Sequence, residues 1–260
     1  MDQPLEISAI PAFSDNYIWL LQRRGGRRCA VVDPGDHRPV LDALDARGLE
    51  LEAILLTHHH WDHAGGVEAL LEATDGSLPV FGPDDDRLGP WCMPCREGDR
   101  VTLPGLELSF AVLDVPAHTR SHIAFHGHGA LFSGDTLFSV GCGRLFEGSP
   151  GDMQRALDKL AALPGDTRLY CGHEYTVSNC AFALQVEPEN AALRSRAAQA
   201  RQLREAGEIT LPSTLEEERA VNPFLRTREP AVVAAARKRE PATEPGAATL
   251  GVIRAWKDSL

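Results

Sequence analysis

Four histidines and one aspartate fall within six consecutive positions of this sequence. The stretch LLTHHHWDHAGG, residues 55–66, places His58, His59, His60, Asp62 and His63 directly after an apolar run. Imidazole nitrogens and carboxylate oxygens are ligands that suit zinc, iron or manganese. His58 and His60 lie two apart at an expected strand end, so an extended backbone points both to one side and His59 away. A helix-capping segment with surface histidines is the alternative, but histidine rarely caps a helix.

Three more residues of metal-ligating type follow apolar strands further along the chain. His118 occurs in VPAHTRSH, Asp135 in LFSGDT and His173 in LYCGHE. Taken singly, each is compatible with an ordinary core, surface or turn residue. Loops at strand ends commonly present functional groups, and three such positions accompany the histidine cluster. The combination favours a metal site built from several segments.

The composition excludes several classes of function. The chain has 260 residues, is 43% hydrophobic and carries a formal net charge of −11, which argues against binding to nucleic acid or anionic membranes. No apolar run approaches the ~18 residues of a membrane span. The N-terminus has no basic flank followed by an apolar core, so we expect no signal peptide. We therefore expect a cytoplasmic protein, with a monomer as the working assumption.

The pattern of apolar residues predicts an α+β protein with a helical C-terminal part. Short strands, some in hairpins, alternate with a few helices up to about residue 175, which indicates two sheets covered by helices. Expected strands cover 5–13, 17–23, 29–35, 52–57, 78–82, 106–117, 122–129, 130–136 and 167–174. Expected helices cover 38–48, a segment starting near Gly65, 150–165, 190–207, 229–240 and 246–260. We expect a metal-binding domain at 1–175 and a helical substrate-binding domain at 176–260.

The six cysteines do not form a disulfide framework on this interpretation. They are dispersed through a chain that is long enough to fold without disulfides, and cytosolic thiols are normally reduced. Cys92 and Cys95, in CMPC, have the spacing of a redox motif. They are expected in a loop broken by proline and glycine, away from a thioredoxin-like context, so neither a redox nor a zinc role is assigned.

The metal-site residues resemble those of a known family. THHHWDHAGG, followed in order by HT, SGDTLF and CGHEYT, resembles the metallo-β-lactamase superfamily. Within it, GCGRLFEG at 141–148, NPFLR at 222–226 and RAWKD at 254–258 are similar to the glyoxalase II family. The resemblance covers nearly the whole chain. It implies an αββα sandwich, a smaller α-helical C-terminal domain and a dinuclear metal site.

The resemblance also implies the role of each candidate ligand. One metal is bound by His58, His60 and His118, the other by Asp62, His63 and His173, and Asp135 bridges the two. Asp62 and Asp135 are then the catalytic carboxylates, acting with a hydroxide shared by the metals. His and carboxylate ligands accept zinc, iron and manganese alike, so we expect two divalent ions, with zinc as the first choice. Asp33 is either a carboxylate that orients a ligand histidine or a turn former before Pro34.

The implied reaction is hydrolysis of a glutathione thioester, S-D-lactoylglutathione, to glutathione and D-lactate. A thiolate is a good leaving group, so no strong general acid and no Ser/His/Asp triad are expected. Arg254 and Lys257, three apart on one helix face, and Arg144 are implied to receive the glycine carboxylate of glutathione, and Tyr175 its cysteinyl part. Without the resemblance, Arg254 and Lys257 are equally compatible with a solvated helix face.

Some residues depart from the family pattern, and other functions stay open. Ala117 and Ser121 replace glycines, and Phe146 stands where some relatives have tyrosine. The other histidines, His37, His122, His126 and His128, match no ligand position.

The alternative functions are a glutathione persulfide dioxygenase with one iron, which has no need of Asp62 as a ligand, and a metal-binding module without activity. A β-lactamase is disfavoured by the missing export signal.

Overall fold

The computed structural model describes residues 4–74 and 76–260 and consists of two compact units. The N-terminal unit contains the described residues up to 114 together with 121–134, and the C-terminal unit contains 115–120 and 135–260. Packing therefore groups residues 135–175 with the C-terminal helices. The expected domain boundary after residue 175 stays a prediction.

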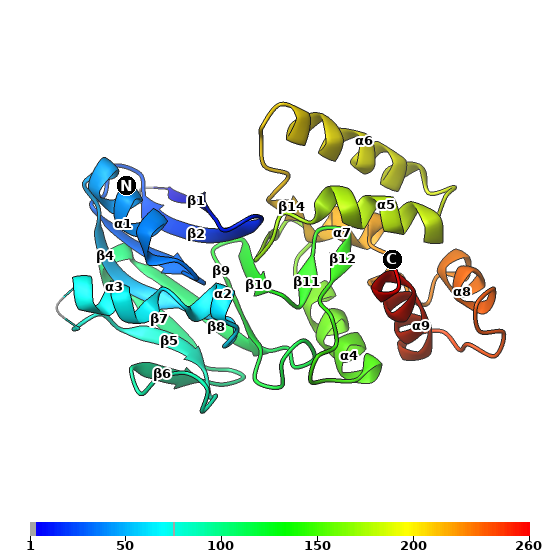
Figure 1. Ribbon diagram of the computed structural model, residues 1–260, viewed down its shortest axis with the longest axis horizontal. Helices are drawn as coiled ribbons and strands as arrows, with labels where there is room; N and C mark the ends of the chain where they lie inside the picture. The colour runs from blue at the N-terminus through cyan, green and yellow to red at the C-terminus, as the bar shows by residue number, and fades with distance from the viewer. Residues whose placement is uncertain (1–3, 75) are drawn as a thin grey trace. The chain divides into compact units, whose positions relative to one another are not determined.

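The N-terminal unit begins with a mixed sheet of six strands (Figure 1). In spatial order they are β1 (Leu5–Ala12), β2 (Asn16–Arg23), β3 (Arg28–Val32), β4 (Glu50–Leu55), β5 (Val80–Pro83) and β6 (Cys92–Cys95). Neighbours are antiparallel from β1 to β3 and parallel from β3 to β6. Because parallel strands end on the same edge of a sheet, the segments after β3 and β4 lie close together.

Helices α1 (His37–Arg47), α2 (Trp61–Ala64) and α3 (Val67–Ala73) follow β3 and β4. Ile18, Leu20 and Ile54 of the strands form a buried core with Val40 of α1 and Val67 of α3. Helix α1 starts at Asp36, whose side chain accepts a hydrogen bond from Arg38 N, and it ends at Gly48 in the left-handed conformation. The apolar spacing of the sequence thus places α1 and α3 on this sheet.

The rest of the N-terminal unit is an antiparallel meander. It contains β7 (Arg100–Leu103), the 3₁₀ turn η1 (Pro104–Leu106), β8 (Leu108–Asp114), β9 (Ile123–Gly127) and β10 (Ala130–Gly134). His128 and Gly129, both with positive φ, form the two-residue turn between β9 and β10. The hairpin expected around GHG is therefore confirmed.

The C-terminal unit is mainly helical. Its helices are α4 (Pro150–Ala161), α5 (Thr176–Val186), α6 (Ala191–Glu205), α7 (Leu215–Val221), α8 (Pro230–Arg237) and α9 (Ala247–Asp258). Short strands β11 (Leu137–Phe138) and β12 (Gly141–Cys142) form a hairpin, and β13 (Arg168–Cys171) pairs with β14 (Ser213–Thr214). Helix α5 packs along α6, and α4 packs against α9. Ser149 and Asp152 form a capping box at the start of α4.

The sequence-based elements agree with the structure at most positions, with one clear error. The CMPC segment is not a loop but the edge strand β6, which pairs with β5. An edge strand tolerates Pro94 because a missing amide donor on the outer side leaves no gap in the sheet. Helices α5 and α7 were not expected.

Within residues 4–74 and 76–260, no helix combines the length and apolar character that a membrane crossing requires.

The strand geometry predicts that Cys92 and Cys95 do not form a disulfide. Residues three apart in a strand point to opposite faces of the sheet. Burial also raises the pKa of Cys92 to about 12 and that of Cys95 to about 11, so both thiols stay protonated. We expect all six cysteines to react with a thiol reagent after unfolding without reductant. A titre of four would contradict the strand assignment.

Candidate metal centre

Asp33 and Thr57 connect the ends of β3 and β4 through a pair of hydrogen bonds. Thr57 N donates to Asp33 Oδ1 at 2.7 Å, and Thr57 Oγ1 donates to Asp33 Oδ2 at 2.7 Å. Asp33 has a left-handed backbone with φ 53°, a strained conformation that often marks functional sites. Both residues are buried. Asp33 is thus more than a turn former, because its carboxylate fixes the segment that leads into the histidine cluster.

These contacts define which ring nitrogen of His58 and His63 can bind a metal. Thr57 Oγ1 gives its single hydrogen to Asp33, so at 3.1 Å from His58 Nδ1 it acts as an acceptor. His63 Nδ1 lies 3.0 Å from Asp33 Oδ2, which also only accepts. Both Nδ1 atoms therefore carry hydrogen, which leaves Nε2 as the lone-pair nitrogen of each ring in its neutral form. Asp33, His58 and His63 each offer one candidate ligand atom, and these three atoms lie within 4.8 Å of one another.

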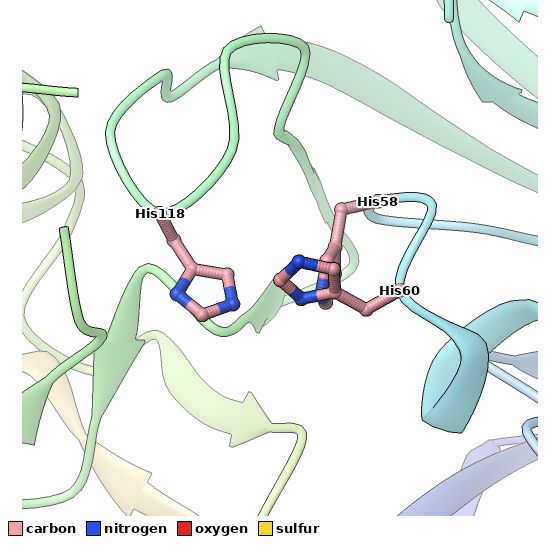
Figure 2. Close-up of side chains that lie close together, drawn as sticks. All are labelled: His58, His60 and His118. Carbon is pink, nitrogen blue, oxygen red and sulfur yellow. The ribbon is translucent and has the colours of Figure 1, made fainter. Parts of the chain in front are cut away.

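His58 and His60 lie together, whereas His59 has a different partner. His58 Nε2 is 3.1 Å from His60 Nδ1, and Figure 2 shows both rings on the segment that leads into α2. His59 Nδ1 lies 3.4 Å from Asp85 Oδ2. The expected separation of His59 is not complete, because its ring also packs against that of His60 with centroids 4.8 Å apart. Strand β4 ends at Leu55, so the three histidines lie beyond it and strand alternation does not apply.

Asp62 is held by Asn16, the first residue of β2. Asn16 Nδ2 donates to Asp62 Oδ2 at 3.0 Å and to the Asp62 carbonyl oxygen at 3.2 Å. Asp62 Oδ2 also lies 3.5 Å from His63 Nε2, the nitrogen that carries the lone pair. A carboxylate oxygen and an imidazole lone pair repel each other unless a cation lies between them. This pair is therefore suited to bind a positive ion.

The C-terminal unit contains a second group of the same kind. His118 Nδ1 lies 3.0 Å from the Arg144 carbonyl oxygen, so this nitrogen carries the hydrogen and Nε2 carries the lone pair. His118 Nε2 is 3.5 Å and His173 Nε2 is 3.3 Å from Asp135 Oδ2. All three side chains are buried. Two imidazole nitrogens that converge on one buried carboxylate oxygen are ligand types of a metal site, and the residues present fit a divalent cation.

Gly134, at the end of β10, leaves space for Thr57. A Cβ atom at this position would lie 2.2 Å from Thr57 Oγ1 and 2.8 Å from His122 Cε1. Gly134 also has φ 48°, which side chains disfavour. The His122 ring stacks on His58 with centroids 4.6 Å apart, so this histidine contacts a candidate ligand although it matches no ligand position. The glycine of SGDT is thus required by close packing.

The four residues expected to bind substrate lie in the C-terminal unit. Arg254, in α9, is buried; its Nη1 donates to the Cys142 carbonyl oxygen at 2.9 Å and its Nη2 to Asp258 Oδ1 at 3.0 Å. Arg144 Nε lies 3.4 Å from the same Asp258 oxygen. The structure therefore brings Arg144 and Arg254 together on one carboxylate.

Lys257 lies one turn from Arg254, and its Nζ donates to Asn179 Oδ1 of α5. Burial lowers the pKa of Lys257 to about 8, and the positive charge of Arg254 contributes to the shift. An amide oxygen is a neutral acceptor, so the Lys257 ammonium has less electrostatic compensation here than a carboxylate would give. The fourth residue, Tyr175, stacks on His173 with ring centroids 4.6 Å apart.

Two family profiles together match nearly the whole chain. The profile of the metallo-β-lactamase superfamily matches residues 13–91 and 95–173, and that of the hydroxyacylglutathione hydrolase C-terminus matches residues 174–260. Proteins named hydroxyacylglutathione hydrolase from Methylobacillus flagellatus and Alkalilimnicola ehrlichii are 55% and 56% identical to the chain. The alignments cover 92% and 97% of this chain, and 94% and 98% of the relatives. The chain belongs to the hydroxyacylglutathione hydrolase family.

Membership of this family confirms the resemblance read from the motifs, including its assignment to glyoxalase II. The members are thioester hydrolases of the metallo-β-lactamase superfamily, and the relatives compared carry neither of the alternative functions in their names. The fold and the histidine–aspartate cluster together are suited to a dinuclear metal site.

Solved structures agree with the predicted fold class. A crystal structure of ETHE1 from Myxococcus xanthus matches with a TM-score of 0.65 and 22% identity over 98% of both chains. The structure of TTHA1623 in a di-iron-bound form matches with a TM-score of 0.58 and 27% identity, over 85% of this chain and 100% of that one. The metallo-β-lactamase-like αββα fold with a helical C-terminal region is confirmed.

Several residues around the site were not predicted from the sequence. Thr57 and Asn16 orient candidate ligands, and Asn179 and Asp258 contact the basic side chains. Each is a common polar residue that also occurs in turns and on helix surfaces. Their partners lie far away along the chain, so no local pattern indicates these roles.

The Thr57 hydroxyl is predicted to matter for metal affinity through Asp33 and His58. Thr57→Val keeps the shape of the side chain but removes the hydrogen bond to Asp33 and the acceptor for His58. Loss of such an orienting contact typically weakens metal binding about 10- to 100-fold. Titration with a competing chelator measures this, with Thr57→Ser as the conservative variant and Thr102→Val, on the exposed face of β7, as the control. Wild-type affinity in Thr57→Val would contradict the role.

Proposed function

We propose that this chain is a hydroxyacylglutathione hydrolase that cleaves S-D-lactoylglutathione to glutathione and D-lactate. The observation that carries the proposal is the presence, in one chain, of histidines and aspartates of metal-ligating type in mutual contact and of a cluster of basic residues. The first suits metal-assisted hydrolysis, and the second suits an anionic carrier thiol. The names of relatives at 55% and 56% identity support the same reaction.

Seven side chains are proposed to bind two metal ions. His58, His60 and His118 would hold one ion, Asp62, His63 and His173 would hold the other, and Asp135 would serve both. Support for the residues of the N-terminal unit comes from their mutual contacts: His58 Nε2 lies 3.1 Å from His60 Nδ1, and His63 Nε2 lies 3.5 Å from Asp62 Oδ2. Support for Asp135 comes from its contacts with His118 and His173. We propose zinc as the metal, with iron and manganese as the alternatives that the same ligand types accept.

When bound, the ions polarise the thioester carbonyl and lower the pKa of a water molecule at the site. The protein contributes the orientation of its ligands. Asp33 and Arg144 O each fix one histidine tautomer, and Asn16 holds the Asp62 carboxylate. The leaving thiolate needs little protonation, so the mechanism requires no further acid. Asp62 and Asp135 are accordingly assigned as the catalytic carboxylates.

The basic side chains are proposed to bind the peptide part of the substrate. The glycine carboxylate of glutathione pairs with Lys257, Arg254 and Arg144, and Tyr175 contacts the cysteinyl part. Lys257 supports this assignment because it is a partly buried ammonium whose hydrogen-bond partner is a neutral amide. The residues all follow position 140, and three of them occur at or after residue 175. Arg254 and Lys257 lie in the proposed helical substrate-binding domain at 176–260, whereas Arg144 and Tyr175 belong to the proposed metal-binding domain at 1–175. The two family matches support a boundary near residue 175.

The function is tested by comparing Asp135→Ala with His59→Ala. We expect wild-type protein to contain close to two metal ions per chain and to release a thiol from S-D-lactoylglutathione. Asp135→Ala should abolish hydrolysis and lower the metal content, because its carboxylate contacts two candidate ligands. His59→Ala should keep both, because His59 pairs with Asp85 instead. Equal damage in the two variants, or a single tightly bound metal in wild type, would refute the assignment.

Lys257 predicts a specific pH dependence of KM. Below pH 8 the ammonium is protonated and binds the glycine carboxylate; above pH 8 it loses its proton, so KM should rise roughly tenfold per pH unit. The rise is bounded at about 10- to 100-fold by the ~1.5–3 kcal/mol of a charged contact. Steady-state kinetics between pH 6.5 and 9.5, corrected for spontaneous hydrolysis, measures it.

Two controls isolate the lysine in this pH experiment. Lys257→Arg keeps its charge over the whole range, so its KM should stay flat. A small thioester without the glutathione peptide should show no rise in wild type. A flat wild-type KM for S-D-lactoylglutathione would remove Lys257 from the proposed site.

A further inference from the structure

Asp258, in the last turn of α9, binds both arginines of the proposed glutathione site. Its Oδ1 lies 3.0 Å from Arg254 Nη2 and 3.4 Å from Arg144 Nε. The side chains of Arg144, Asp258 and Arg254 are 65%, 38% and 5% exposed, so the pair with Arg254 is sheltered and that with Arg144 open to solvent. One protein carboxylate therefore occupies the guanidinium groups that a substrate carboxylate requires.

The position of Asp258 in its helix is unfavourable by itself. A negative charge near a helix C-terminus faces the negative end of the helix dipole. The charge is compensated here by the two arginines. With Lys257, the group contains three cations, Arg144, Arg254 and Lys257, and one anion, Asp258. The neighbouring Cys142 thiol adds no negative charge, because burial raises its pKa and keeps it neutral. The group thus has positive charge left for one further carboxylate.

We infer that Asp258 is a positioning residue that competes with the glycine carboxylate for Arg144 and Arg254 and so limits the affinity of the site for glutathione. The inference rests on the proposed function. Substrate and product carry the same glycine carboxylate, so a stronger contact tightens both equally and does not lower the barrier of the chemical step. A competing carboxylate keeps the product from being retained.

The test is Asp258→Asn in the metal-loaded protein. We expect it to bind glutathione about 2- to 5-fold more tightly by calorimetry, which is the range for a partly exposed ion pair, and to lower KM for S-D-lactoylglutathione by the same factor. The gain should shrink as salt is added, because the contacts are partly exposed. A purely structural role would not produce a gain in affinity.

Glu189→Gln is the matched control. Glu189 is 91% exposed, lies in the same unit and pairs with Arg194, so the variant makes the same change in net charge away from the site. Its glutathione affinity should equal that of wild type. Thermal unfolding of both variants shows whether either one is less stable.

The outcomes separate this inference from the proposed function. If wild type binds glutathione and hydrolyses the thioester, but Asp258→Asn binds glutathione equally or more weakly, Asp258 does not compete and only the inference fails. An equal gain in Glu189→Gln would also overturn it, because net charge would then explain the effect. If wild type neither binds glutathione nor hydrolyses the thioester, the proposed function and the inference both fail.

Discussion

The carboxylate of Asp33 is the point on which the candidate metal-binding residues of the N-terminal unit depend. It accepts hydrogen bonds from Thr57 N, Thr57 Oγ1 and His63 Nδ1, and through Thr57 it also determines the hydrogen on His58. One buried carboxylate thereby joins two strand ends and selects the reactive nitrogen of two histidines. Three further constraints serve the same arrangement, namely the left-handed backbone of Asp33, the missing side chain of Gly134 and the parallel pairing of β3 with β4.

The helices of the C-terminal unit have an equivalent task for the hairpin β11–β12. Glu218 of α7 accepts hydrogen bonds from Val140 N at 2.7 Å and from Ser213 Oγ at 2.7 Å, and burial raises the pKa of its carboxyl group. Asn222 Nδ2 donates to the carbonyl oxygens of Phe138 and Gly141. The hairpin joins the segment of Asp135 to that of Arg144. The helical region therefore shapes the segment between a candidate metal ligand and a candidate substrate contact.

The sequence indicated the candidate ligand types and one supporting residue, Asp33, but not the other supports. Histidine clusters are rare enough for their spacing to carry information, and the buried strands that precede His58, Asp135 and His173 were readable from apolar runs. Asn179 and Asp258 were not, because their roles arise from partners on other segments. CMPC was misassigned because strand formation at a sheet edge depends on the neighbouring strand rather than on local propensity. Helix α5 was missed because it is apolar on most sides and lacks a clear period.

The facing lone pairs of the metal centre couple the stability of the fold to the supply of metal. In each unit, imidazole nitrogens and carboxylate oxygens lie 3.3–3.5 Å apart, and where both atoms are acceptors this arrangement raises the free energy of the folded chain unless a cation separates them. An ion that binds the folded state alone adds RT ln(1 + [L]/Kd), about 2.7 kcal/mol at a hundredfold excess over Kd. The amount of folded protein in a cell, and its survival against proteolysis, is then a function of free metal concentration as well as of temperature.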